Sequence, residues 1–254
     1  MAQYGFFFDQ SRCYGCQACS VACKDWNDLE PGPKKWMSVY DWETGTLPDV
    51  RINILAFNCG HCDDPACAKA CPSGAIFKED KYGAVLVDED KCTGARKCLD
   101  ACPYGSPKFA NDNPSAKMSK CTMCIDRLEK GEKPVCVLSC PMRAFDFGPI
   151  DELRQKYGDC AQLAEMPDPK LTHPNVVYKA HRDRQQFVPL DGKKVLELQK
   201  DRNVGQYKDA GLDPVYTDLK AETDPPAGEI KRNKLVMVNK TAEAVMAATS
   251  NDLG

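Results

Sequence analysis

The chain has 254 residues, of which 43% are hydrophobic and 28% are charged, with a formal net charge of −3. Nothing in this composition indicates an intrinsically disordered chain or a nucleic-acid-binding protein, because acidic and basic residues are mixed along the chain rather than gathered in a basic stripe. No stretch approaches the roughly 20 apolar residues that a membrane-spanning helix needs. The length suits one large domain or two small ones, and the most informative feature is the count of 16 cysteines.

The N-terminal residues 1–12 contain the short apolar run Phe6–Phe8 but no basic segment before it. They do not have the pattern of a secretory signal peptide. We therefore expect a cytoplasmic protein by default, and an extracytoplasmic one if the protein is exported with a partner that carries a twin-arginine signal.

Fifteen of the 16 cysteines lie in four groups, and the first group has the spacing C-x2-C-x2-C-x3-C. In the other three groups the last cysteine is followed by proline. The third group has Ala95 where the pattern calls for a cysteine. The groups are Cys13, Cys16, Cys19 and Cys23; Cys59, Cys62, Cys67 and Cys71; Cys92, Cys98 and Cys102; and Cys121, Cys124, Cys136 and Cys140.

This spacing favours iron–sulfur clusters over the two other common uses of cysteine. Disulfide scaffolds are typical of short secreted chains, and structural zinc uses two separated pairs of ligands. Three closely spaced thiolates can instead bind three corners of one cubane, while the fourth cysteine, next to the following helix, points to a neighbouring cluster. Four groups predict four clusters, and the missing cysteine predicts that one of them differs.

Two hairpins are predicted between the motifs. An insertion covers about residues 24–58. Within it, apolar and polar residues alternate in Trp36–Trp42 and in Val50–Phe57, and the segment between these two runs contains glycine and proline. Ala75–Phe77 and Ala84–Val87 are two short apolar runs joined by a polar turn that contains glycine. Both patterns are typical of antiparallel strand pairs.

Downstream of the last motif the sequence becomes polar. Asp151–Tyr157, followed by glycine, predicts a short helix, and further helices are expected near Lys193–Lys200 and Thr241–Thr249. Leu235–Val238 has the composition of a strand.

The repeated motifs predict an α+β fold made of two ferredoxin-like units related by pseudo-symmetry, each with two clusters. A hairpin insertion and an extended C-terminal segment would be added to them. We expect residues 1–150 to form the four-cluster domain and residues 151–254 to wrap over it or over a partner. A flexible surface tail remains the alternative for the second part.

Several stretches closely resemble the iron–sulfur (β) subunit of dimethyl-sulfoxide-reductase-type molybdenum enzymes, and the likeness covers about residues 3–158. The resemblance implies a non-catalytic subunit of anaerobic respiration that relays single electrons between a large molybdenum or tungsten catalytic subunit and a quinone-linked or soluble partner. A membrane-anchor subunit would be a further partner. The stretches are Tyr4–Phe7, Cys59–Cys62 with Pro65, Pro72–Ala75 and Asp146–Leu153.

The resemblance also implies how the motifs pair, the first with the fourth and the second with the third. The expected ligand sets are Cys13, Cys16, Cys19 and Cys140 for cluster 1; Cys23, Cys121, Cys124 and Cys136 for cluster 2; Cys59, Cys62, Cys67 and Cys102 for cluster 3; and Cys71, Cys92 and Cys98 for cluster 4. In the family, electrons pass through the clusters in this order, so Ala95 would lie at the far end.

A methyl group cannot bind iron, so Ala95 predicts that cluster 4 is a [3Fe-4S] cluster beside three [4Fe-4S] clusters. Nitrate reductase β subunits, which also lack this cysteine, have a three-iron cluster there. A three-iron cluster would have a higher reduction potential than its neighbours, because losing an iron and a thiolate alters the charge of the site. Two alternatives stay open: alanine is an introduced substitution, or the fourth iron is kept by water or a non-cysteine side chain.

The remaining candidates have ordinary explanations beside functional ones. Cys160 lies outside every motif and is expected to be a plain thiol. His61 could donate a hydrogen bond to a cluster or hold its loop. The three tryptophans are expected to pack in the core or in a subunit interface. The three basic residues beside the ligand cysteines would raise the reduction potentials of the clusters, unless their side chains are simply solvated. These residues are Trp26, Trp36, Trp42, Lys24, Arg96 and Lys97.

Two other functions remain as alternatives. The β subunits of formate dehydrogenases and hydrogenases share the four motifs. A zinc-binding adaptor or nucleic-acid module belongs to another class, and metal analysis would separate it, since the iron–sulfur interpretation requires about fifteen irons per chain and acid-labile sulfide.

Overall fold

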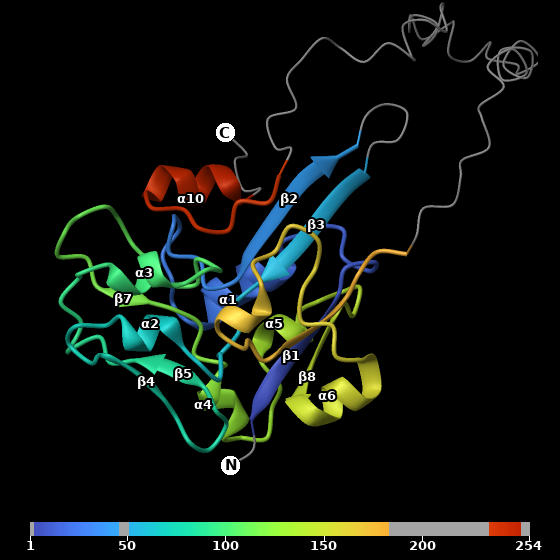
Figure 1. Cartoon of the computed structure of the whole chain (residues 1–254), viewed down its shortest axis with the longest axis horizontal. Helices are drawn as coiled ribbons and strands as arrows, with labels where there is room; N and C mark the ends of the chain where they lie inside the picture. The colour runs from blue at the N-terminus through green and yellow to red at the C-terminus, as the bar shows by residue number, and fades with distance from the viewer. Residues whose placement is uncertain (1–2, 46–50, 183–233, 250–254) are drawn as a thin grey trace, which may run out of the picture. The chain divides into compact units, whose positions relative to one another are not determined.

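The computed structural model describes residues 3–45, 51–182 and 234–249 (Figure 1), and all of these belong to one compact unit. Short helices and small sheets alternate along the chain, which confirms the mixed α+β class. The strands are β1 Tyr4–Asp9, β2 Ser38–Thr44, β3 Arg51–Phe57, β4 Ile76–Lys78, β5 Val85–Val87, β6 Lys108–Phe109, β7 Met118–Ser119, β8 Phe145–Pro149 and β9 Val176–Lys179. The helices are α1 Ala18–Trp26, α2 Ala66–Lys69, α3 Lys97–Ala101, α4 Ile125–Leu128, α5 Val135–Leu138, α6 Ile150–Tyr157, the 3-10 turn Pro169–Leu171 and α10 Ala242–Ala248.

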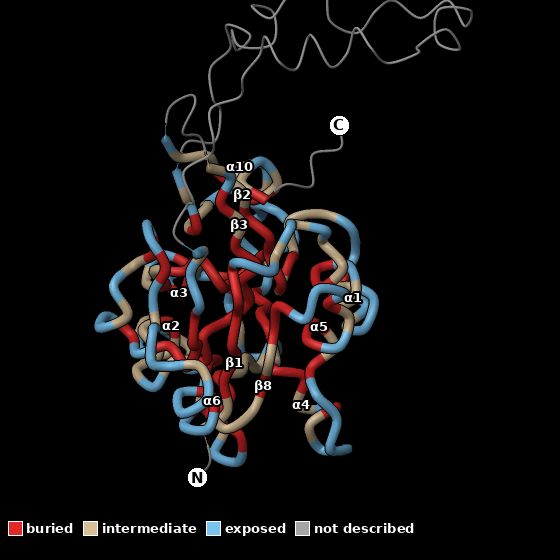
Figure 2. Tube along the Cα trace, turned by 90° about the vertical axis from the view of Figure 1, so that its right-hand side faces the viewer, coloured by how far each residue is buried: buried red, intermediate tan, exposed pale blue. Residues whose placement is uncertain are grey.

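The strand β1 is the centre of the largest sheet, in which the strand order is β8-β1-β9. It pairs antiparallel with β8 and parallel with β9, and Figure 2 shows it buried along its length. Successive side chains of a strand point to opposite faces. Phe6 packs against Phe147 with ring centroids 5.0 Å apart, whereas Phe7 stacks on Tyr157 of α6 at 3.6 Å. The three phenylalanines are all buried because both faces of β1 are covered.

This sheet brings together the two ends of the cysteine-rich region. The first motif follows β1, and the fourth motif precedes β8. The helix α1 of the first motif packs against α5 of the fourth, and α2 of the second motif packs against α3 of the third. The motifs are therefore paired in space, outer with outer and inner with inner.

Both predicted hairpins are confirmed. The strands β2 and β3 pair antiparallel from Ser38↔Phe57 to Thr44↔Arg51, and the residues that join them, 46–50, lie outside the described ranges. The strands β4 and β5 pair antiparallel with Phe77 opposite Leu86. The sequence interpretation missed the pair β6 and β7, because each strand has only two residues.

The C-terminal part contains both confirmed and wrong predictions. The helices α6, which ends at Gly158, and α10, capped by the Thr241 hydroxyl, are confirmed. The strand expected at Leu235–Val238 is wrong, since these residues pair with no strand of the described structure. The helix expected at Lys193–Lys200 lies outside the described residues. No helix in the described ranges is long and apolar enough to cross a membrane.

Residues beyond position 150 contribute to the compact unit up to residue 182. The backbone N–H of Asn175, just before β9, donates to the Gly60 carbonyl at 2.8 Å. Residues 234–249 also pack on the cysteine-rich part: Met237 is buried, and the Ala242 N–H donates to Asp112 at 3.0 Å. The described C-terminal residues thus lie against the loops that carry the second and third motifs.

The contact of Met237 with Gly105 can be tested. Gly105 has φ +60°, and a Cβ there would press on the Met237 carbonyl oxygen and lie 3.1 Å from Val238 Cα. We expect Gly105→Ala to lower the free energy of unfolding by about 1–3 kcal/mol, the usual cost of overpacking, and to release residues 234–249 to proteases. Gly131→Ala is the matched control, because Gly131 has φ +75° and no neighbour within 4 Å. Equal effects of the two substitutions on Tm and on proteolysis would contradict this docking.

Candidate metal centres

In each motif, the residue two positions after the first cysteine has a left-handed backbone conformation, with positive φ. The residues are Gly15 (φ 76°), His61 (φ 41°), Gly94 (φ 74°) and Met123 (φ 60°). Left-handed backbone turns the chain sharply and is rare for residues other than glycine. The turn curls each loop, so that cysteines close in sequence point to one common space.

The first and third motifs have the same local backbone. Gln17 (φ 64°) and Arg96 (φ 57°) are each the left-handed residue before a helix, α1 and α3. Each follows a left-handed glycine two positions earlier. Ala95 in the third motif therefore stands where Cys16 stands in the first.

The first group of thiols contains Cys13, Cys16, Cys19 and Cys140. Burial raises the pKa of Cys19 to about 12, and the neighbouring Cys13 and Cys140 contribute to the increase. The backbone N–H of Ala144 donates to Cys140 Sγ at 3.3 Å. Cys16 is exposed, as is the adjacent Tyr14, so this group lies near the surface.

The second group lines a small cavity. Its four thiols come from α1, the fourth motif and α5: Cys23, Cys121, Cys124 and Cys136. Burial raises the pKa of all four thiols, that of Cys23 to about 12, and the proximity of Cys124 adds to the effect on Cys23. The indole of Trp36 also lines the cavity, and its Nε1 donates to Ser119 Oγ at 2.9 Å. All four thiols of this group are buried among packed side chains.

The third group contains Cys59, Cys62, Cys67 and Cys102. Burial raises the pKa of Cys62 to about 12, with added effects from Cys59 and Cys102. The pKa of Cys67 is also raised, first by burial and then by Cys59 and Cys102. Cys62 Sγ lies 3.3 Å from the Thr172 hydroxyl, so a residue of the C-terminal part closes this group.

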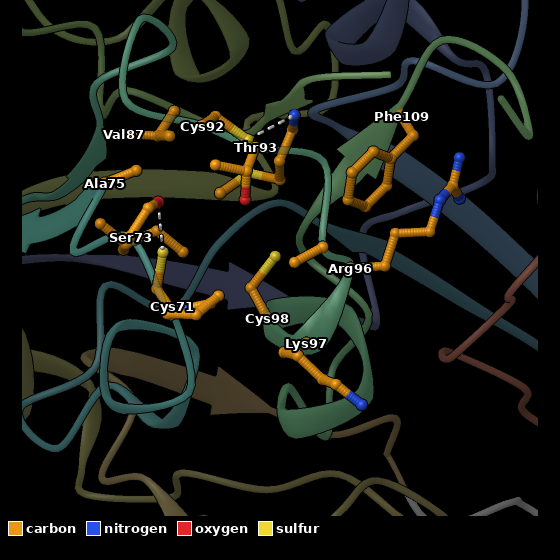
Figure 3. A pocket seen from close by; sticks show the side chains of 14 residues that line it. Cys71, Ser73, Ala75, Val87, Cys92, Thr93, Arg96, Lys97, Cys98 and Phe109 are labelled. Carbon is orange, nitrogen blue, oxygen red and sulfur yellow. Dashed lines mark hydrogen bonds between the residues drawn. The ribbon is translucent and has the colours of Figure 1, made fainter. Parts of the chain in front are cut away.

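The fourth group has three thiols, Cys71, Cys92 and Cys98, around a small cavity (Figure 3). Ala95 also lines this cavity. Burial raises the pKa of Cys98 to about 11, and Cys92 and Cys71 contribute to the increase. For Cys71, burial raises the pKa, but hydrogen bonds from Ser73 and from backbone N–H groups outweigh burial. The pKa of Cys71 is therefore lowered overall. Cys92 Sγ accepts from the Met118 N–H at 3.3 Å.

No group of three or more His, Cys, Asp or Glu side chains in residues 3–45, 51–182 and 234–249 could hold one metal ion. A structural zinc needs four such ligands around one centre, whereas in a cubane each cysteine binds a different iron.

Cys160 and His61 each make a hydrogen bond within the described structure. Cys160 is exposed and its thiol donates to the Gln162 carbonyl at 3.1 Å, away from the four groups. His61 Nδ1 accepts from the Val85 N–H at 3.0 Å, and burial together with Lys120 and Lys78 holds its pKa well below the ordinary value. The neutral imidazole therefore has its proton on Nε2.

The basic residues and tryptophans beside the motifs are also tied to the rest of the molecule. Lys24 Nζ donates to the carbonyl of Glu30 at 2.6 Å. Arg96 stacks on Phe109 at 4.2 Å and, like Lys97, points away from the thiols in Figure 3. Trp42 is buried in β2, while Trp26 donates from Nε1 to Asp126 at 2.9 Å and is 42% exposed. These contacts position the loops and helices that carry the cysteines.

The sequence interpretation missed a buried lysine between two groups. Lys120 is 1% exposed, and its ammonium donates to the carbonyl oxygens of Val85 and Cys121. It also partly offsets the increase in the pKa of Cys67. Lys120 precedes Cys121 in sequence, but nothing in the sequence distinguishes it from the solvated lysines near other motifs.

Comparisons with known proteins agree with this geometry. A 4Fe-4S dicluster domain matches residues 50–150, and a second 4Fe-4S dicluster domain matches residues 12–76. These matches place the protein among iron–sulfur electron-transfer proteins with several clusters.

The similar proteins define the family. The B chain of the anaerobic dimethyl sulfoxide reductase of Escherichia coli is 48% identical over 185 residues, which are 70% of this sequence and 88% of that protein. The B chain of the same enzyme in Haemophilus influenzae is 44% identical over 191 residues, 72% and 91% of the two sequences. The B subunit of the sulfite dehydrogenase of Allochromatium vinosum is 37% identical over 172 residues, 60% and 71% of the two. The protein belongs to the family of these reductase B chains, the iron–sulfur electron-transfer subunits of dimethyl-sulfoxide-reductase-type molybdenum enzymes.

The buried Lys120 gives a test of how the site is held together. Lys120→Met removes hydrogen bonds to two buried carbonyls, so we expect the unfolding free energy of the holoprotein to fall by about 1–3 kcal/mol. Lys117→Met is the control, since Lys117 makes a 3.8 Å ion pair with the fully exposed Asp90 and such pairs contribute little. Thermal unfolding followed by circular dichroism measures both. A Tm for Lys120→Met equal to that of the control would contradict a supporting role.

Proposed function

We propose that the four groups of thiols hold four iron–sulfur clusters, and that the protein passes single electrons along them. The observation that carries the proposal is the gathering of fifteen cysteines into four groups, two of which enclose cavities. The proposed ligands are Cys13, Cys16, Cys19 and Cys140 for cluster 1; Cys23, Cys121, Cys124 and Cys136 for cluster 2; Cys59, Cys62, Cys67 and Cys102 for cluster 3; and Cys71, Cys92 and Cys98 for cluster 4.

The electrostatics of the thiols support metal ligation. Burial keeps most of these cysteines protonated in the absence of metal, as the raised pKa values of Cys19, Cys23 and Cys62 indicate. Only the thiolate binds iron, so cluster assembly releases these protons and stabilises the fold at the same time. A bound cluster supplies one-electron chemistry, while the protein holds it, excludes water and donates N–H groups to sulfur, as Met123 does to Cys121 at 3.4 Å.

The groups are linked in the order expected for a relay. The helix α1 carries Cys19 of the first group and Cys23 of the second. Cys59 of the third group is close enough to Cys121 of the second to raise its pKa beyond the effect of burial. The helix α3 contains Cys98 of the fourth group near its start and ends next to Cys102 of the third. Each group therefore has a direct structural link to the next.

The pairing of helices supports two units related by pseudo-symmetry. The first and fourth motifs would form one unit through α1 and α5, and the second and third motifs the other through α2 and α3. Residues 1–150 would form this four-cluster domain, with the hairpin of β2 and β3 inserted. Residues 151–254 would cover it, as the described contacts at Thr172 and Met237 suggest.

The two ends of the relay would meet different partners. The exposed Cys16 and Tyr14 lie at the first group, where a large molybdenum or tungsten catalytic subunit would contribute or receive electrons. The most informative relatives are B chains of an anaerobic dimethyl sulfoxide reductase, which implies such a partner and a membrane-anchor subunit. The anchor, or a soluble partner, would contact the fourth group.

Ala95 makes the fourth cluster a three-iron cluster in this proposal. The oxygen-bearing side chains that line its cavity are Ser73 and Thr93. The Ser73 hydroxyl is already 3.6 Å from Cys71 Sγ, which leaves it poorly suited to replace a thiolate. Three [4Fe-4S] clusters and one [3Fe-4S] cluster would then be present.

Restoring the cysteine tests this assignment. The oxidised wild-type protein should show the electron paramagnetic resonance signal of a three-iron cluster at close to one spin per chain, with about fifteen irons. We expect Ala95→Cys to abolish the signal and raise the iron content to about sixteen, because Ala95 stands at the backbone position of Cys16. Ala95→Ser is the control for size. A wild-type protein with no three-iron signal would overturn the assignment.

The ligand sets are tested by a pair of cysteine variants. Cys136→Ala removes a buried ligand of the second group. We therefore expect the variant to lose that cluster, which lowers the iron content by about four per chain. Cys160→Ser should keep the full iron and sulfide content, because the Cys160 thiol donates a hydrogen bond to the Gln162 carbonyl and lies outside the four groups. Iron and acid-labile sulfide are measured per chain. Full iron content in Cys136→Ala would contradict the assignment of the second set.

A further inference from the structure

Asn58 has a buried side-chain amide nitrogen with no hydrogen-bond partner among the described residues. The residue follows β3 and is 6% exposed. Its Nδ2 is one of the buried side-chain donors that have no partner within the described parts of the chain. A buried donor without a partner is costly, so native proteins retain one only where something else accepts its hydrogen.

Asn58 is one of the residues that line the cavity of the second group of thiols. The cavity is bounded by Cys23, Cys121, Cys124 and Cys136, and also by Asn27 and Asn58. The Asn27 amide is already engaged, at 2.8 Å from the Cys23 carbonyl and 3.7 Å from its Sγ. Asn58 is therefore the amide donor of this cavity that has no acceptor among the described residues.

The backbone fixes Asn58 at the junction of two groups. Its carbonyl accepts from the Ser106 hydroxyl at 3.2 Å, and the next residue, Cys59, belongs to the third group. Cys59 and Cys121 are also electrostatic neighbours. The adjacent residues Asn58 and Cys59 therefore place a side-chain amide at the second group and a thiol in the third.

We infer that Asn58 is a positioning residue of the electron relay, whose amide donates an N–H···S hydrogen bond to the cluster held by Cys23, Cys121, Cys124 and Cys136. The inference rests on the proposed ligand sets. Hydrogen bonds to cluster sulfurs are one of the levers that set reduction potential. Because reduction adds negative charge, the donor stabilises the reduced form more than the oxidised form and raises the potential.

Substitutions at Asn58 test the inference through the potential of one cluster. Asn58→Leu keeps the approximate size and removes the donor, and Asn58→Asp replaces the donor nitrogen with an oxygen. We expect both to lower the midpoint potential of the second cluster, the aspartate variant by more because its charge opposes reduction. The other three midpoints should stay where they are. Redox titration of the complex, followed by electron paramagnetic resonance, measures all four.

The matched control is Asn53→Leu on the same hairpin. Asn53 is also a buried asparagine, but its amide donates to Thr44 Oγ1 at 2.9 Å and to the Trp42 carbonyl at 3.4 Å. No midpoint should change in this variant. An unchanged second midpoint in Asn58→Leu, or an equal change in the control, would overturn the role of Asn58.

The wild-type protein offers a measurement that does not depend on a variant folding. With asparagine labelled by ¹⁵N only in its side chain, pulsed electron paramagnetic resonance of the reduced second cluster should detect two coupled amide nitrogens, those of Asn27 and Asn58. A single coupled nitrogen overturns the inference. Iron and sulfide analysis comes first: a wild-type protein without the second cluster refutes the ligand sets, whereas a full content with unchanged potentials refutes only Asn58.

Discussion

The left-handed turn inside each motif is the constraint on which the rest of the structure depends. Gly15, His61, Gly94 and Met123 adopt positive φ two positions after the first cysteine. The turn directs several thiols of one loop to a common space, and the last cysteine of the motif lies in the short helix that follows or just after it. Since the thiol of that cysteine lies with the group of another motif, the same local geometry both gathers thiols and joins one group to another.

The sheet and the hairpins serve this arrangement. Pairing of β1 with β8 brings the first and fourth motifs together although Cys13 and Cys140 are far apart in sequence. The main core covers one face of β1 and α6 the other, which explains why three successive phenylalanines precede the first motif. The described structure has few long elements, so bound clusters would contribute much of the stability of the folded state.

The elements that could be predicted from the sequence are those whose signals are local. The strands β2 and β3 alternate apolar and polar residues, β4 and β5 are short apolar runs joined by a polar glycine turn, and α6 ends at a glycine, so each was found. The pair β6–β7 was missed because two-residue strands leave no periodicity. The strand at Leu235–Val238 was wrong because Met237 is buried without a strand partner and its carbonyl accepts from the Tyr40 hydroxyl. The grouping of cysteines followed from family resemblance. Asn58 and Lys120 could not be found, since burial of a polar residue depends on tertiary packing.

Burial distinguishes the second group of thiols from the groups at the two ends. Cys121 and Cys136 of the second group are fully enclosed, and their pKa values are raised by burial. At the ends, Cys16 is exposed, and the pKa of Cys71 is lowered by hydrogen bonds from Ser73 and nearby backbone. With clusters bound as proposed, a partner that covers an end would change the solvation of that cluster and with it the potential. The four thiols of the second group are all buried, so the potential of the cluster proposed there would be set by residues of this protein.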